Sequence, residues 1–275
     1  MSPSLLQSSD PEPPEHVRAA FGVWEETPEL LPHGPVWRCG DVVLRPVEAA
    51  AQAAWVAQTL DALHAEGLRL ARPLRSSDGR WVVGGWSATR YLEGRCEPRH
   101  DEVIAVSLRL HAATAGLPRP RFLDDRDDLW AVADAVAWGE RDAMGLPGGG
   151  GELFAELADL AAARRPVALR PQVVHGDLFG NVLFAGSAPP AVIDLVPYWR
   201  PPEWAAAVVA VDALAWGGAD PGLVQRWASL PGWPQVLLRA LLFRVAAHAA
   251  HPLSTAESLA GLRHAAKLIR DANEP

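Results

Sequence analysis

The spacing of apolar residues along the chain changes character near residue 92. Up to that point, short apolar stretches are separated by turn signals such as Gly40-Asp41 and Ser77-Asp78-Gly79. This pattern is typical of β-hairpins. We predict four strands in two hairpins, over residues 36–39, 42–47, 70–75 and 81–91. A helix over residues 49–65 is expected between the two hairpins, because apolar residues recur there at helical spacing.

Beyond residue 92 the apolar residues keep helical spacing over longer stretches. We predict helices over residues 100–115, 129–141, 152–164, 204–216, 222–229, 234–251 and 255–272. Residues 148–151 are expected to be a flexible break because all four are glycine. The chain is therefore expected to have an α/β (α+β) fold with two lobes. Residues 1–92 would form a small antiparallel β lobe with a disordered tail over residues 1–16, and residues 93–275 a larger helical lobe.

Composition narrows the possible functions. The net charge of −8 argues against a general nucleic-acid binder. The two cysteines, Cys39 and Cys96, lack the spacing of a metal site, as is usual for proteins of a reducing cytosol. The N-terminal stretch lacks the basic start and apolar core of a signal peptide, and the most apolar stretch, residues 205–216, is too short to span a bilayer. We expect a cytoplasmic protein with no nucleic-acid or membrane partner.

The most informative segment is His-Gly-Asp-Leu-Phe-Gly-Asn over residues 175–181, which is followed by an apolar run that ends at Asp194. We predict strands over residues 182–184 and 191–193, with a turn over residues 185–187. The hairpin would place an acid, Asp177, and an amide, Asn181, on one loop, and a second acid, Asp194, on another. Protein kinases carry a similar order of residues in their catalytic and metal-binding loops.

Phosphoryl transfer gives each of these residues a role. One carboxylate must accept or orient the proton of the acceptor hydroxyl, and Asp177 is the candidate catalytic base. Oxygen ligands must hold Mg²⁺ against the phosphates, and Asn181 and Asp194 are the candidate metal ligands. His175 completes the candidate catalytic loop, where we expect it to brace the backbone rather than take part in the chemistry.

The HGDL sequence, with Ile-Asp in place of Asp-Phe-Gly, resembles the aminoglycoside phosphotransferase and choline kinase-like family. The wider sequences HGDLFGNVLF and VIDLVPYWRPPEWAAAV are similar to an uncharacterised actinobacterial branch of that family. The resemblance implies a two-lobed, protein-kinase-like fold. It also implies Mg²⁺-dependent transfer of the terminal phosphate of ATP or GTP to a hydroxyl or amine of a small molecule. The nucleotide is expected near Glu93 and Gly94, at the connection between the lobes.

The small lobe departs from the kinase pattern. The only lysine, Lys267, lies in the last predicted helix, so it cannot be the strand lysine that holds the phosphates. Arg45 occupies the matching place and is the candidate phosphate-binding residue, with Glu48 or Gln52 as its expected partner. The glycine-poor segment over residues 31–35 would make a weak phosphate loop. Asn181 follows Asp177 by four positions, one fewer than in the kinase signature.

Some polar features carry two interpretations. The acidic run over residues 124–128 is expected to cap a helix, although it could hold a basic substrate. Residues 197–202 are expected to form a proline-rich rigid loop, with Arg200 available for an anionic group. His248 and His251 lie three apart on a predicted helix, where satisfied helix histidines are favoured over a metal site.

Two functions from different classes remain open from the sequence. The favoured one is a small-molecule phosphotransferase that uses ATP or GTP and Mg²⁺. The alternative is a nucleotide-binding pseudokinase or scaffold in which the missing lysine and the shortened loop mark a loss of turnover. The presence of Asp177, Asn181 and Asp194 together favours the enzyme, since a scaffold has little use for three such groups. A third possibility is non-phosphoryl chemistry on a kinase fold, such as nucleotidyl transfer.

Overall fold

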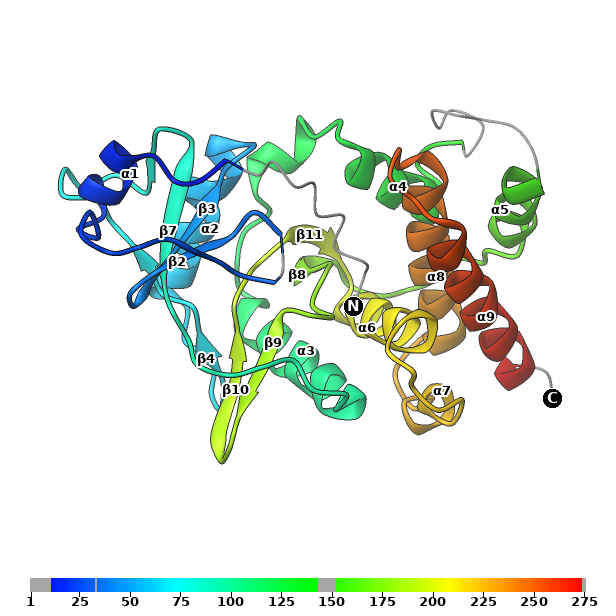
Figure 1. Cartoon of the computed structure of the whole chain (residues 1–275). Helices are drawn as coiled ribbons and strands as arrows, with labels where there is room; N and C mark the ends of the chain where they lie inside the picture. Colours follow the sequence, from blue (N-terminus) through cyan, green and yellow to red (C-terminus); the bar gives the residue numbers. More distant parts are fainter. Residues whose placement is uncertain (1–10, 33, 143–151, 274–275) are drawn as a thin grey trace. The chain divides into compact units, whose positions relative to one another are not determined.

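The computed structural model describes residues 11–32, 34–142 and 152–273, which form two compact units (Figure 1). The β unit contains the described residues up to Glu97 together with residues 181–195. The helical unit contains those from Pro98 to Gly180 and from Val196 onward. A small antiparallel sheet in one unit and a larger set of helices in the other confirm the predicted α/β fold class.

The main sheet of the β unit has the strand order β1-β2-β3-β7-β5, and β6 pairs with β7; every pairing is antiparallel. Its strands are β1 (Glu29–Leu30), β2 (Trp37–Cys39), β3 (Val42–Pro46), β5 (Pro73–Leu74), β6 (Val82–Val83) and β7 (Trp86–Arg90). Alternate residues of β3 and β7, including Leu44 and Trp86, are buried in one apolar cluster. Because of this alternation, the strands of the hairpins can be predicted from the sequence.

Helices α1 (Glu15–Ala20) and α2 (Ala50–Ala62) also belong to the β unit. The predicted helix over residues 49–65 corresponds to α2. No helix was predicted at α1, yet Glu15 and His16, which were expected in a disordered tail, lie in it. Val17 of α1 is fully buried in the same apolar cluster as the sheet, which explains why so short a helix is held in place.

The strand predicted over residues 70–75 is wrong in detail, because the structure divides it between two sheets. Strand β4 (Arg69–Leu70) pairs in parallel with β10, whereas β5 pairs with β7. Between them, the Arg72 side chain donates to the carbonyl of Leu63 at the end of α2, 2.9 Å away. Pro73 follows and has no N–H to continue a ladder.

Strands β9 (Val182–Ala185) and β10 (Ala188–Val192) form the hairpin expected after the HGD segment. Together with β4 they make a second, three-stranded sheet of the β unit. The register places Val182 opposite Val192, so the first residue of β9 and the last residue of β10 lie side by side at one end of the hairpin.

The helical unit is built around two buried helices, α6 (Pro202–Ala215) and α8 (Trp233–Ala250). Every residue of α6 from Trp204 to Leu214 is buried, which explains the apolar stretch as a core helix. The other elements are α3 (His100–Thr114), η1 (Arg121–Asp124), α4 (Leu129–Trp138), α5 (Glu152–Ala162), β8 (Gln172–His175), β11 (Pro197–Arg200), α7 (Leu223–Arg226) and α9 (Ala256–Asn273).

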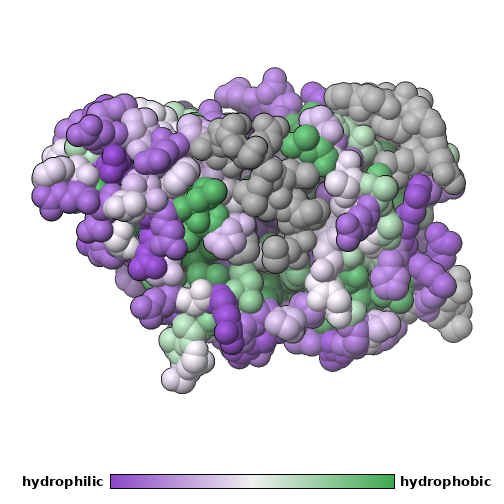
Figure 2. Space-filling model, viewed as in Figure 1, coloured by the Kyte–Doolittle hydropathy of each residue, from purple (hydrophilic) through white to green (hydrophobic). Residues whose placement is uncertain are grey.

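Few large apolar side chains of the described residues are exposed, and among the coloured residues of Figure 2 the hydrophilic ones predominate. Among the described residues, no helix combines the length and the apolar character needed to cross a bilayer. The expected flexible break over residues 148–151 and His33 of the proposed phosphate loop lie outside the described residues.

Three further boundaries differ from prediction. Residues 81–91 are not one strand, because a turn at Gly84 and Gly85, both at positive φ, divides them between β6 and β7. Residues 197–200 form strand β11, not a loop, because they pair with β8 over four residues. The prolines fit this arrangement: Pro197 is the first residue of the strand, and Pro202 opens α6, where its missing N–H has no helical partner. Helix α4 stops at Trp138 because Gly139 adopts a left-handed conformation, with φ of +77°.

Candidate active site

The HGD segment leaves β8 at a point where only glycine fits. The Gly176 N–H donates to the carbonyl of Val196, 2.9 Å away, next to the pairing of β8 with β11. A Cβ atom at Gly176 would lie 2.3 Å from the Tyr198 ring, well inside van der Waals contact. Tyr198 is itself fixed between Trp204 and Phe243 of the core. The glycine therefore lets the loop pass close to a rigid aromatic ring.

We expect Gly176→Ala to destabilise the helical unit by about 1–3 kcal/mol, the usual cost of overpacking. Urea denaturation followed by tryptophan fluorescence measures the loss. Gly116→Ala is the matched control, because nothing lies within 4 Å of a Cβ at that position. Equal midpoints for the two variants would show that the ring at Tyr198 moves aside freely.

His175 stabilises the loop from inside the helical unit. Its side chain is fully buried, and its Nδ1 accepts the N–H of Asp177, 3.1 Å away. The N–H of His175 in turn donates to Nε2 of His111 on α3, 2.9 Å away. Burial, together with the neighbouring His175, lowers the pKa of His111 to about 3, so His111 is a neutral acceptor. This geometry fits a bracing role for His175.

Asp177 is held by a buried charged group from α8. One of its carboxylate oxygens lies 2.6 Å from Nη2 of Arg244, whose side chain is only 2% exposed. Arg244 also pairs with both oxygens of Asp212 on α6, a residue with no exposed side-chain surface. The Asp177 side chain is 41% exposed, so it is the one member of this cluster that solvent or a substrate can reach.

The cluster of Asp177, Arg244 and Asp212 holds charge in an apolar setting. Burial disfavours the charged guanidinium, but the two carboxylates outweigh it and raise the pKa of Arg244 above its usual range. Burial raises the pKa of Asp212 to about 6, against the opposing attraction of Arg244. Because an unpaired buried charge is costly, Arg244 is fixed in place and fixes Asp177 in turn.

Asn181 and Asp194 lie at the same end of the β9–β10 hairpin in the β unit. Asn181 directly precedes β9, and its carbonyl accepts the N–H of Ile193, 3.2 Å away, just beyond β10. Asp194 follows Ile193, and one of its oxygens accepts the N–H of Leu195 at 2.8 Å. One amide oxygen and one carboxylate on one hairpin are hard donors of the kind that Mg²⁺ shares with nucleotide phosphates.

Arg45 pairs with Asp194, not with the helix residues expected from the sequence. Nη1 of Arg45 on β3 lies 2.6 Å from Oδ1 of Asp194, and both side chains are about 30% exposed. The prediction of Glu48 or Gln52 as its partner is therefore wrong. Arg45 does lie on a strand beside the candidate metal ligands, where the sequence placed a phosphate-binding cation.

The connection at Glu93 and Gly94 runs beside β9. The N–H of Arg95 donates to the carbonyl of Phe184 at 3.0 Å, and the reverse bond is 2.9 Å long. Gly94 has φ of +142°, and a Cβ atom there would lie 3.0 Å from the Phe184 carbonyl oxygen. Close packing of two backbones thus explains the glycine. Glu93 is exposed, and its carbonyl accepts from Arg69 at 3.1 Å.

The sequence matches a known protein family. The model of the phosphotransferase enzyme family matches residues 36–238, which is well over half of the chain. The chain belongs to this family. The match spans Arg45, Asp177, Asn181 and Asp194, and it ends within α8 before Arg244. No curated sequence matches the chain.

Solved structures with the same fold include kinases of small molecules. A microcompartment-associated aminopropanol kinase has a TM-score of 0.57 at 15% identity, over 93% of this chain and 94% of that one. A choline/ethanolamine kinase family protein from Mesorhizobium loti has a TM-score of 0.53 at 19% identity, over 87% and 85%. A thermostable mutant of aminoglycoside phosphotransferase APH(4)-Ia has a TM-score of 0.51 at 15% identity, over 87% of this chain and 91% of that one.

These findings confirm the predicted family and the kinase-like fold of this phosphotransferase. The assignment to an actinobacterial branch stays a prediction. Within the described residues, no group of three or more His, Cys, Asp or Glu side chains is placed to hold a metal ion.

The structure corrects the expectation that Arg200 is available for an anion. Its guanidinium is bound to Asp134 by bonds of 2.8–3.1 Å and to Glu140 by bonds of 2.7 and 2.8 Å. Arg200 is therefore a structural link between β11 and α4.

In the acidic run over residues 124–128, Asp128 accepts the N–H groups of Trp130 and Ala131 at 3.0 Å, as the helix-cap interpretation predicts.

The contacts of His248 on α8 and of His251, which follows the last residue of this helix, are also explained. Nδ1 of His248 lies 3.3 Å from the Ser254 hydroxyl, and Nδ1 of His251 accepts the N–H of Leu253 at 3.2 Å. Burial, together with the nearby Arg244, lowers the pKa of His248 to about 4. These contacts favour the interpretation of satisfied helix histidines.

Sequence reasoning missed Arg244 and Asp212. Both are charged residues within largely apolar helices, which is unusual unless the charge is paired. That anomaly could have marked them as partners of one another. It could not have identified Asp177 as the third member, because 67 residues separate Asp177 from Arg244.

Proposed function

We propose that this phosphotransferase moves the terminal phosphate of a nucleoside triphosphate to a hydroxyl group of a small molecule, with Mg²⁺ as the metal. The observation that carries the proposal is Asp177, a partly exposed carboxylate fixed at the end of β8 by a buried arginine. Family membership supplies the reaction class. ATP is favoured as the donor, since the related APH(4)-Ia has been solved with ADP and with AMP-PNP, in each case with hygromycin B.

In the proposed reaction, Asp177 accepts the proton of the acceptor hydroxyl as its oxygen bonds to the terminal phosphorus. The bond from that phosphorus to the bridging oxygen breaks, and the nucleoside diphosphate leaves with the electron pair. Asp194 and Asn181 would hold Mg²⁺, which when bound neutralises phosphate charge. Arg45 would bind phosphate oxygens, for which its planar, five-donor guanidinium is well suited.

The Arg45–Asp194 pair implies an exchange of partners when nucleotide binds. Both groups carry out their proposed roles only if Arg45 turns from Asp194 to a phosphate and Asp194 turns from Arg45 to the metal. Each side chain is about one third exposed, so the pair is weak enough to be replaced by stronger, multivalent contacts.

The first test is whether the protein binds and turns over nucleotide. Thermal shift with ATP and GTP, with and without Mg²⁺, should show stabilisation that depends on the metal. Phosphate transfer from labelled ATP to a panel of amino alcohols and aminoglycosides then identifies the acceptor class. Magnesium-dependent binding with no transfer to any acceptor and no background hydrolysis would instead support the pseudokinase.

We expect Asp194→Ala to abolish the magnesium dependence of nucleotide stabilisation without unfolding the β unit. Loss of Asp194 also frees Arg45, so binding of nucleotide without metal should be retained or slightly stronger. Thermal shift with ATP at several magnesium concentrations measures both effects. Asp61→Ala, at an exposed position on α2, controls for the change in net charge. A wild-type magnesium response in Asp194→Ala would remove this residue as a ligand.

Arg45→Ala should have the opposite signature, with nucleotide binding lost first. Removal of a charge-assisted contact to phosphate is expected to weaken ATP binding by about tenfold or more. Isothermal titration with ATP and Mg²⁺ measures the loss. Arg38→Ala is the control, since Arg38 is a neighbouring sheet cation that lies over Tyr91. Equal ATP affinities for the two variants would contradict a phosphate-binding role for Arg45.

A further inference from the structure

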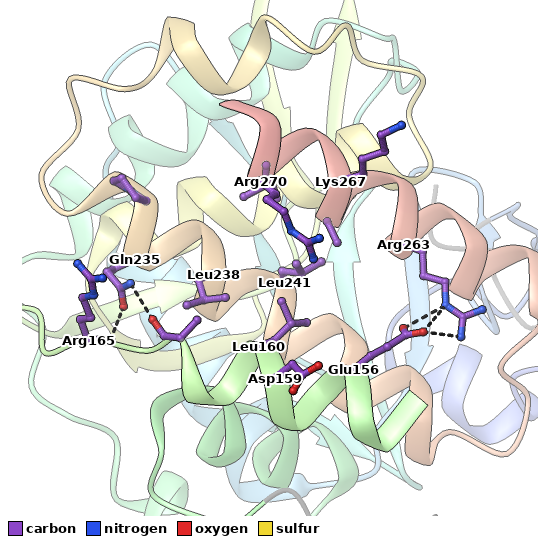
Figure 3. A pocket seen from close by; sticks show the side chains of 14 residues that line it. Glu156, Asp159, Leu160, Arg165, Gln235, Leu238, Leu241, Arg263, Lys267 and Arg270 are labelled. Carbon is purple, nitrogen blue, oxygen red and sulfur yellow. Dashed lines mark hydrogen bonds and ion pairs between the residues drawn. The ribbon is translucent and has the colours of Figure 1, made fainter. Parts of the chain in front are cut away.

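The helical unit contains a cavity of about 710 Å³ that is separate from the candidate active site (Figure 3). It lies over α8, where α5 and α9 flank that helix, and its volume is in the range of small-molecule sites. Its floor and walls are mainly apolar, with Leu160, Leu238, Leu241 and Ile269 among them. None of Asp177, Arg244 and Asp212 lines it.

An ion pair at one end of the cavity and hydrogen bonds at the other connect its walls. At one end Arg263 of α9 pairs with Glu156 of α5, with bonds of 2.9–3.1 Å. At the other end, Oε1 of Gln235 accepts the N–H of Arg165 at 2.7 Å, and its Nε2 donates to Ala163 at 3.3 Å. The first pair joins α9 to α5, and the Gln235 contacts join α8 to the segment that follows α5. The cavity is therefore built into the fold.

The charge of the cavity is opposite to that of the protein. Four cations and two carboxylates line it, which gives a net charge of +2 on a chain whose net charge is −8. Arg263 and Glu156 neutralise each other. Figure 3 shows the Arg270 side chain reaching from α9 toward Leu241 on the floor, whereas Lys267 is turned outward. Arg270 thus places a cation at the apolar floor.

We propose that this cavity binds a free small molecule with an apolar body and one acidic group. The apolar body would lie on Leu238 and Leu241, and the acid would face Arg270. An apolar lining supplies affinity through buried area, and a single well-placed cation selects for the anion. This site is independent of the proposed phosphotransfer, because it uses none of the same residues.

The fluorescent probe 8-anilinonaphthalene-1-sulfonate tests the proposal, since it joins an aromatic body to one sulfonate. The full chain should bind one probe molecule saturably. Arg270→Gln should weaken that binding by about three- to tenfold, the range between an exposed and a desolvated charge contact. Arg109→Gln, which makes the same charge change on α3 outside the cavity, should leave it unchanged.

Two further experiments separate recognition of the anionic group from nonspecific hydrophobic binding of the probe. The uncharged probe N-phenyl-1-naphthylamine should bind wild type and Arg270→Gln alike. Leu238→Glu, which puts a carboxylate on the floor, should reduce sulfonate binding by more than Arg270→Gln does, with an unchanged circular dichroism spectrum. If Leu238→Glu does not fold, the result for Arg270→Gln decides alone. Arg270 is exposed, so its substitution should leave the fold intact. Wild-type sulfonate affinity in Arg270→Gln, or an equal loss with the neutral probe, would overturn the proposal.

A membrane surface is the competing source of an acidic, apolar ligand. The protein should stay in the supernatant when phosphatidylglycerol vesicles are sedimented. Co-sedimentation that Arg270→Gln abolishes would overturn the assignment to a free small molecule and point to a lipid surface instead.

Discussion

Asp177→Asn should retain nucleotide binding and reduce phosphoryl transfer by roughly 10²–10⁴-fold, the usual contribution of a positioned general base. The substitution keeps the size of the side chain and a hydrogen bond to Arg244, but the amide cannot take a proton. Rates of transfer to the best acceptor, or of background nucleotide hydrolysis, measure the effect on kcat. Because Asp177 is partly exposed, the fold should be unaffected.

The control for Asp177→Asn is Asp220→Asn, which removes a carboxylate from the same unit at a position paired with Arg226. Thermal shift with ATP and Mg²⁺ should be the same for wild type and both variants. Activity equal to wild type in Asp177→Asn, above a no-enzyme control, would remove Asp177 from the mechanism. A wild-type protein with no turnover would instead favour the pseudokinase.

The sequence alone was sufficient to predict helices and strands where the local sequence pattern and the burial of the residues agree. The β9–β10 hairpin has apolar strands around a short turn with Gly186, and the structure has both predicted strands there, although β10 begins three residues before the predicted start. The helices α3, α6, α8 and α9 were likewise predicted within about two residues of their ends, because their apolar residues keep helical spacing over many turns. Long periodic elements depend little on distant contacts.

Prediction failed where partners far apart in the sequence decide the structure. Residues 197–200 have prolines around them and read as a loop, but pairing with β8 makes them a strand. Residues 70–75 read as one strand, and pairing of β4 with β10 divides them. The same limit applied to the side-chain partners in the site: the sequence near Arg45 did not identify Asp194 as its partner, and the sequence near Arg200 did not identify Asp134 and Glu140.

The buried cluster yields the second large prediction. Arg244→Met should destabilise the helical unit by about 3–5 kcal/mol, because it leaves the fully buried Asp212 without a counter-charge. Urea denaturation gives the free energy of unfolding. Arg226→Met is the control, since Arg226 also pairs with two aspartates but at an exposed surface, where such pairs contribute little.

A double variant separates the stability role of Arg244 from its positioning role. Arg244→Met with Asp212→Asn removes both buried charges, so most of the lost stability should return. Asp177 nevertheless remains without the contact that orients it, so kcat should stay about tenfold or more below wild type while the KM for nucleotide changes little. If Arg244 only stabilised the fold, kcat would recover together with stability. Recovery of stability without recovery of kcat is expected, because the 2.6 Å contact to Asp177 is absent in the double variant.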